Sequence, residues 1–286
     1  MMQAFHSTWT KPFFKSHEGD FYVEDFELLT TILSALKWRE FNGSIKMITD
    51  KAGAIYYRKW GLEDLWDLGI DDTLEEEMDS SIDESVFWAA GKLYALEKQD
   101  TPCVMMDTDF IVWENIKAHL MKDGVTLIHR EKIQDNVYPE QSAFLMKDGY
   151  RFSPHWNWEI EPCNTAFLCM RDESFKRYYI QEAKAFMKGA LGRDPLIYMV
   201  FAEQRLLAMC AEEKKIDLYA LSSLEELFHH TQKRFTHIWG HKRLLRNSEK
   251  EREKFCKRCI ERIERDYPDF YPKLKEIESL QKYMRD

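Results

Sequence analysis

The 286-residue chain carries 41 Lys and Arg against 50 Asp and Glu, a formal net charge of -9, and 44% of its residues are hydrophobic and 14% aromatic. This composition excludes a disordered chain, and the acidic balance excludes nucleic acid as an expected partner, since phosphate contacts require a basic surplus. No signal-peptide pattern opens the chain, and no apolar run approaches the ~20 residues that span a bilayer. We therefore expect a cytoplasmic protein with one large folded unit.

The first elements alternate between strand and helix. Residues 2–9 are expected to form a strand, and the apolar spacing over residues 25–42 predicts a helix. A second strand over 45–49 and a second helix over 51–60 follow. Later elements are a helix over 86–96, strands over 101–106, 125–129, 165–170 and 217–221, and helices over 173–188 and 195–212. This order predicts a three-layer, Rossmann-related α/β domain with right-handed crossovers.

Two stretches of the chain are distinguished by their charge. Residues 63–84 are strongly acidic, and we interpret them as a solvated connection around a short strand. From Lys242 to the C-terminus there are 14 Lys and Arg against 10 Asp and Glu, and apolar residues recur there at helical spacing. We therefore place a catalytic-sized domain at 1–242 and a charged helical extension at 243–286. A peripheral contact of this basic extension with an anionic membrane stays open.

The strongest chemical signal is Asp107-Thr108-Asp109, directly after the apolar run at 102–106. Open α/β sheets bind ligands beyond the carboxyl ends of their strands, where Asp107 is expected to lie. Two carboxylates there supply the hard oxygen ligands that Mg²⁺ or Mn²⁺ prefers, and such a metal neutralises a diphosphate leaving group. The same pair is also compatible with a phosphatase of the haloacid-dehalogenase type, in which Asp107 would be the nucleophile. That family carries its motif on the first strand, whereas here several elements precede it.

A second signal is the segment from His237 to Lys242. A neutral imidazole can complete a metal site, and a lysine can meet diphosphate oxygens as a point charge. A lone histidine is, however, more often an ordinary surface or core residue than a metal ligand.

Together, Asp107-Thr108-Asp109 and the later His-x-x-Gly-x-Lys resemble the glycosyltransferases related to glycogenin and the bacterial lipopolysaccharide galactosyltransferases. The resemblance implies a GT-A-like fold, with Mn²⁺ or Mg²⁺ held by Asp107, Asp109 and His237 and the diphosphate of a UDP-sugar contacted by Lys242. The family usually has one more residue between the glycine and the lysine of the late motif.

Two further segments are similar to motifs of that family. Asn164-Thr165-Ala166 resembles an Asn-Ala-Gly segment, with Ala166 in place of glycine, and Glu203-Gln204 resembles an acidic-Gln pair near the reacting sugar. The resemblance implies that Asn164 binds substrate. Glu203 is either paired with a cation or is a general base or charge stabiliser, and we assign Glu203 and Gln204 to catalysis.

Binding of the nucleotide sugar and of its acceptor is expected to involve five other residues. Asp50 and Gly53 follow an early strand, where this fold binds base and ribose, although Asp50 is equally suited to cap the next helix. Arg58 either reaches a phosphate or faces solvent. Trp156 and Trp158 suit a sugar acceptor, although aromatic residues more often serve packing.

The sequence thus predicts a metal-dependent glycosyltransferase that moves a hexose from a nucleotide diphosphate sugar, with UDP as the expected nucleotide, to a saccharide or lipid-linked saccharide acceptor. A role in surface polysaccharide synthesis would fit this chemistry. The alternatives are the phosphatase and a GT-A-like module that binds sugar or a partner without turnover.

Overall fold

The computed structural model describes residues 2–284 and is organised around a mixed, mostly parallel sheet of seven strands. The strand order is β3-β2-β1-β4-β7-β6-β8. Only β7 runs antiparallel to its neighbours, β4 and β6. The strands are β1 (Gln3–Thr8), β2 (Ile45–Thr49), β3 (Ile70–Asp71), β4 (Cys103–Met106), β6 (Val125–Leu127), β7 (Phe167–Met170) and β8 (Leu218–Ala220).

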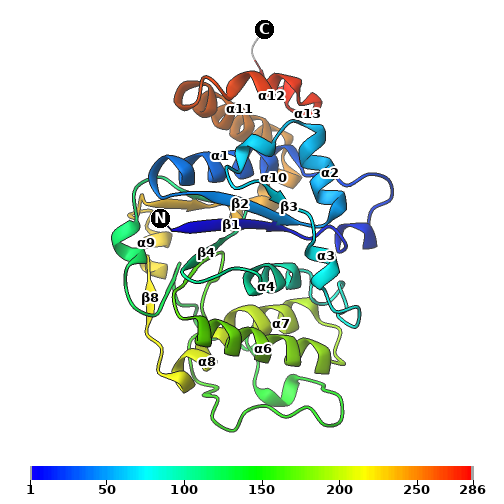
Figure 1. Cartoon of the computed structure of the whole chain (residues 1–286), viewed down its shortest axis with the longest axis vertical. Helices are drawn as coiled ribbons and strands as arrows, with labels where there is room; N and C mark the ends of the chain where they lie inside the picture. The colour runs from blue at the N-terminus through cyan, green and yellow to red at the C-terminus, as the bar shows by residue number, and fades with distance from the viewer. Residues whose placement is uncertain (1, 285–286) are drawn as a thin grey trace.

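Helices cover both faces of this sheet (Figure 1). On one side lies α1 (Asp25–Phe41), and on the other lie α4 (Ala90–Glu97) and α6 (Glu173–Gly189). Every residue of β4 and β7 is buried, as expected for apolar strands covered on both faces. The predicted three-layer α/β fold is confirmed.

The other helices before the C-terminal part are α2 (Lys51–Lys59), α3 (Leu74–Glu77), α5 (Lys117–Leu120), α7 (Pro195–Val200), α8 (Leu206–Lys214) and α9 (Leu224–Phe228). The 3-10 turns in this part include η1 (Phe13–Lys15), η2 (Glu63–Leu65) and η3 (Gln141–Ala143).

The predicted helical extension is present and packs on α1 (Figure 1). It comprises α10 (Lys242–Asn247), α11 (Glu249–Asp266), α12 (Tyr271–Glu276) and α13 (Glu278–Gln281). Cys256, Ile260 and Ile263 on α11 are buried in the same apolar cluster as α1. Lys37 of α1, only 4% exposed, pairs with Asp266 at 2.8 Å. The extension therefore shares the core of the main domain, and the boundary at residue 242 stays a prediction.

Three of the differences from the sequence predictions concern the elements around the aspartates and Glu203. The helix expected over 86–96 begins only at Ala90, because the preceding residues form turns closed by the Asp83 carbonyl. The helix expected over 195–212 contains a π-helical turn, η4 (Phe201–Arg205), between α7 and α8. Two strands of three residues each, β5 (Phe110–Val112) and β9 (Phe235–His237), form a separate antiparallel sheet that was not predicted.

The topology gathers several loops at one edge of the main sheet. Since β1, β2, β4 and β6 are mutually parallel, their carboxyl ends lie at this edge. The antiparallel β7 begins at the same edge, which adds Asn164 and Thr165. Among the helices of residues 2–284, none has the length and apolarity that crossing a membrane would require.

Candidate metal centre

The small sheet brings His237 to the two aspartates. In the β5–β9 pairing His237 lies opposite Phe110, the residue after Asp109. The Ile238 amide also donates to the Asp109 carbonyl at 3.3 Å. Backbone pairing therefore sets the position of the imidazole relative to the carboxylates, although the two segments are far apart in the chain.

Asp107, Asp109 and His237 form a cluster that suits a metal ion. One potential ligand atom from each lies within 4.8 Å of the others. The Asp109 side chain is 5% exposed and that of His237 15%, while the Asp107 side chain is 26% exposed. Two carboxylates and an imidazole are a donor set that Mn²⁺ accepts, and carboxylates alone suit Mg²⁺. The three residues thus fit the metal that the sequence predicted.

Two lysines neutralise the aspartates. Lys92 Nζ lies 2.6 Å from Asp107 Oδ1 and also contacts Glu203. Lys242 Nζ lies 3.0 Å from Asp109 Oδ2 and 3.1 Å from Glu27 Oε1. Each aspartate therefore has one ammonium partner. The Lys242 side chain is 29% exposed, whereas that of Lys92 is 15% exposed and lies between two carboxylates.

Burial raises the pKa of each aspartate, and nearby positive charge lowers it. Burial raises the pKa of Asp107, and the nearby carboxylates of Asp109 and Glu203 raise it further, while Lys92 opposes them. Burial would also raise the pKa of Asp109, but the hydrogen bond and charge of His237, together with Lys242, outweigh it and hold that pKa below its usual range. Asp109 is therefore the more firmly ionised carboxylate of the pair.

Glu203 and Gln204 lie on the π-helical turn between α7 and α8. Glu203 is 3% exposed, accepts a hydrogen bond from Thr165 Oγ1 at 2.8 Å and pairs with Lys92. Gln204 accepts from the Tyr138 hydroxyl at 2.7 Å. Short π-helical turns recur at functional sites because they redirect side chains locally. Glu203 is thus connected to the metal cluster through Lys92, and the predicted catalytic roles of Glu203 and Gln204 stay predictions.

The residues expected to bind the nucleotide have contacts of other kinds. Asp50 caps α2, and its buried carboxylate accepts from the backbone N–H of Gly53 at 3.0 Å and from that of Thr10 at 2.7 Å. Of the two roles considered for Asp50, the contacts in the structure are those of the helix cap. Arg58 pairs with Asp72 at 2.8 Å and is half-exposed. The structure does not connect these side chains with the metal cluster, and their nucleotide-binding roles stay predictions.

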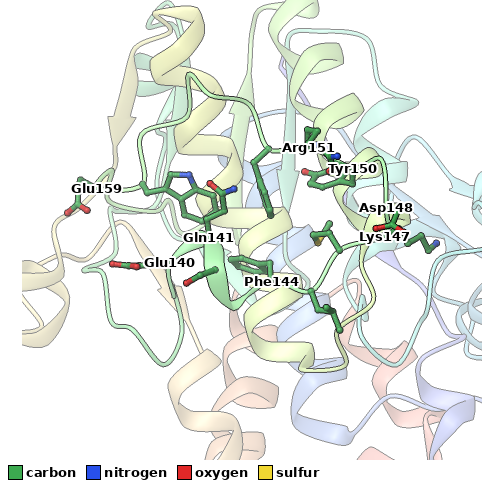
Figure 2. A pocket seen from close by; sticks show the side chains of 13 residues that line it. Glu140, Gln141, Phe144, Lys147, Asp148, Tyr150, Arg151 and Glu159 are labelled. Carbon is green, nitrogen blue, oxygen red and sulfur yellow. The ribbon is translucent and has the colours of Figure 1, made fainter.

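The two tryptophans occupy different environments. Trp156 is buried against Phe152 and Phe201, which favours packing over sugar binding. Trp158 stacks on Phe201 and lines an open cavity of about 770 Å³. Figure 2 shows Glu140 and Glu159 on one side of this cavity and Lys147 and Asp148 on the other. Of the predicted site residues only Trp158 lines it, and none of the three residues of the metal cluster does.

Lys92 and Thr165 were not predicted as site residues, although both are connected to the aspartates. Lys92 interrupts the apolar sequence of α4, where a lysine requires a buried partner. That signal was available in the sequence. Thr165 carried none, because its contact with Glu203 depends on how β7 begins beside the π-helical turn.

Comparison with known proteins places the chain in a family. A profile described as "Family of unknown function (DUF6734)" matches residues 1–277. The chain belongs to this family. No curated protein matches it.

Three solved structures are distantly similar to this DUF6734 chain, and all three are named as glycosyltransferases. The apo form of mouse xyloside xylosyltransferase 1 is 8% identical with a TM-score of 0.41, covering 77% of this chain and 85% of that one. The PaToxG glycosyltransferase is 9% identical with a TM-score of 0.42, covering 98% and 85%. The apo bifunctional glycosyltransferase WbbM is 11% identical with a TM-score of 0.41, covering 77% of this chain but only 38% of the other.

Proposed function

We propose that the protein is a metal-dependent glycosyltransferase of GT-A-like architecture that transfers a hexose from a nucleotide diphosphate sugar, with UDP as the expected nucleotide, to a saccharide or lipid-linked saccharide acceptor. The observation that carries the proposal is the convergence of Asp107, Asp109 and His237 within 4.8 Å at the carboxyl edge of the sheet. Ligands of α/β sheets bind at this edge. Surface polysaccharide synthesis, a cytoplasmic location and a peripheral membrane contact belong to the same proposal and rest on the sequence alone.

The surrounding residues suit a diphosphate leaving group. Asp107, Asp109 and His237 would hold Mn²⁺ or Mg²⁺, which as a Lewis acid supplies charge stabilisation for the departing diphosphate. Lys242 stands beside Asp109, where its ammonium group can meet a phosphate oxygen. Lys92 holds Asp107 and Glu203 together. Glu203 thereby keeps its carboxylate next to the cluster, where it would stabilise positive charge on the transferring sugar.

Hydrolysis of nucleotide sugars in the absence of an acceptor tests the proposal. The protein is stripped of metal, supplied with Mn²⁺ or Mg²⁺ and incubated with a panel of nucleotide diphosphate sugars, and release of the nucleoside diphosphate is measured. We expect metal-dependent release and a loss of at least about tenfold in Asp109→Asn, which removes a ligand charge while keeping the side-chain size. The matched control is Asp123→Asn, the same change at an exposed aspartate.

The other outcomes distinguish the alternatives. Equal hydrolysis by Asp109→Asn and wild type would refute the metal assignment. A covalent aspartyl-phosphate at Asp107 would identify a phosphatase instead. Thermal stabilisation by UDP with Mn²⁺, without turnover of any nucleotide sugar, would identify a binding module.

A further inference from the structure

A second polar pair lies at the same edge of the sheet, just beyond β6. His129 Nε2 and Glu131 Oε1 are 3.7 Å apart. The His129 side chain is 8% exposed and that of Glu131 24%. Neither residue belongs to the metal cluster, and neither had been predicted as a site residue. Their positions next to the start of β7 place them beside Asn164.

The hydrogen bonds around His129 determine which of its ring nitrogens carries the proton. Nδ1 lies 3.1 Å from the Arg130 carbonyl oxygen. A carbonyl only accepts, so Nδ1 must be the donor. Burial lowers the pKa of His129, an effect that Glu131 and the Arg130 carbonyl oppose, and the net direction is downward. The ring is therefore neutral near pH 7, with a lone pair on Nε2.

Glu131 is fixed by Asn164 in a similar way. The Ala166 N–H donates to Asn164 Oδ1 at 3.2 Å, which leaves the Asn164 NH₂ group to donate to Glu131 Oε1 at 3.0 Å. The carboxylate and the bare Nε2 of His129 are thus two acceptors that face each other without a proton between them. Two acceptors this close are stabilised by a donor that reaches both, and the 24% exposed side chain of Glu131 leaves room for one to approach.

A chain of contacts connects this pair with the metal cluster. Thr165, the residue after Asn164, donates to Glu203, which Lys92 joins to Asp107. A second metal is disfavoured, because within residues 2–284 the one grouping of three or more His, Cys, Asp and Glu ligands is the Asp107 cluster. Hydroxyl groups remain: water offers two protons, and neighbouring hydroxyls of a sugar offer one proton to each acceptor.

We propose that His129 Nε2 and the Glu131 carboxylate together bind the hydroxyl group that attacks the donor sugar, which is water in hydrolysis and a saccharide hydroxyl in transfer. This inference rests on the proposed function. As the attacking oxygen forms its bond to the anomeric carbon, the bond from that carbon to the diphosphate oxygen breaks. The bonding electrons leave with the diphosphate, and the hydroxyl proton passes to Nε2. Asn164 acts here as a positioning residue for Glu131.

The tautomer and the kinetics test the pair by separate routes. Nitrogen NMR of ¹⁵N-histidine-labelled protein should show His129 protonated at Nδ1 and bare at Nε2 near neutral pH. A proton on Nε2, in either the neutral or the charged ring, overturns the proposal, because the ring would then donate to Glu131 directly. This measurement requires neither substrate nor turnover.

Glu131→Gln is the decisive variant, because its amide oxygen can still accept from Asn164 while the carboxylate charge that would hold the attacking hydroxyl is removed. We expect hydrolysis of the nucleotide sugar to fall at least about tenfold while the Kd for UDP with Mn²⁺ is unchanged. His129→Asn, which keeps the donor to the Arg130 carbonyl, should show the same split. Glu161→Gln, at an exposed position, is the matched control.

The results separate this inference from the function on which it rests. Hydrolysis by Glu131→Gln at the wild-type rate overturns the acceptor pair and leaves the glycosyltransferase proposal standing. Wild-type protein that neither binds UDP with Mn²⁺ nor hydrolyses any nucleotide sugar refutes both.

Discussion

Because of the buried His6 on β1, we expect the stability of the protein to fall as the pH is lowered. It is fully buried, and burial lowers its pKa to about 3 from the usual 6.5, an effect that Asp109 only partly opposes. Trp66 Nε1–H donates to Nδ1 at 3.2 Å, so Nε2 carries the proton and donates to Ser34 Oγ at 3.0 Å. A second proton would point from Nδ1 at the indole N–H. The folded state therefore holds the ring neutral.

The sign and size of the effect follow from the two pKa values. Between pH 6.5 and about 3 the unfolded chain binds a proton that the folded protein does not, so stability falls as pH is lowered through this window. The slope is about 1.4 kcal/mol per pH unit, which makes His6 responsible for a loss of about 2 kcal/mol between about pH 7 and about pH 5.

Urea unfolding at those two pH values measures this loss. In His6→Gln the amide can accept from Trp66 and donate to Ser34 but does not titrate, so we expect its free energy of unfolding to fall by about 2 kcal/mol less than that of wild type on acidification. His17→Gln, at an exposed histidine, serves as the control. Equal pH dependence in wild type and His6→Gln would refute the reasoning.

Two further predictions concern a close backbone approach and a buried hydrogen bond. In Gly53→Ala the new Cβ would stand 2.1 Å from Thr49 Oγ1, so we expect a loss of about 1 to 3 kcal/mol in urea unfolding, whereas Gly240→Ala, with open space around it, should change stability little. Tyr283→Phe removes the hydroxyl that donates to the buried Asp25 carboxylate and should cost about 1 to 3 kcal/mol in the same assay. An unchanged stability of Tyr283→Phe would show that the docking of the C-terminal helices on α1 does not depend on this contact.

The layered fold was predictable because its signals are local. Buried strands such as β4 appear in the sequence as short apolar runs, α6 as a long periodic segment, and α1 as a long segment rich in apolar residues. The position of Asp107 followed from the end of β4. By contrast, β5 and β9 have three residues each, too few for a period to be recognised, and their pairing joins distant segments. Only the resemblance to a known motif indicated that His237 lies beside Asp107.

Contacts that depend on the packing of several elements could not be predicted from the sequence. The π-helical turn that carries Glu203 interrupts a segment with an unbroken helical pattern. The partnership of Glu131 with Asn164 requires the antiparallel direction of β7, which starts at the edge where β6 ends. Asp50 illustrates the opposite case, because its capping role is local and was visible in the sequence.

The charges around the aspartates indicate why both lysines and a divalent metal suit this cluster. Asp107 and Asp109 are joined through Lys92 to Glu203 and through Lys242 to Glu27, so four carboxylates meet two ammonium groups. The cluster with all groups ionised retains two negative charges, which a divalent cation neutralises. In a buried site such a balance lowers the cost of desolvation. A diphosphate arriving there would add negative charge next to Lys242, whose ammonium group the two neighbouring carboxylates keep protonated by raising its pKa against the effect of burial.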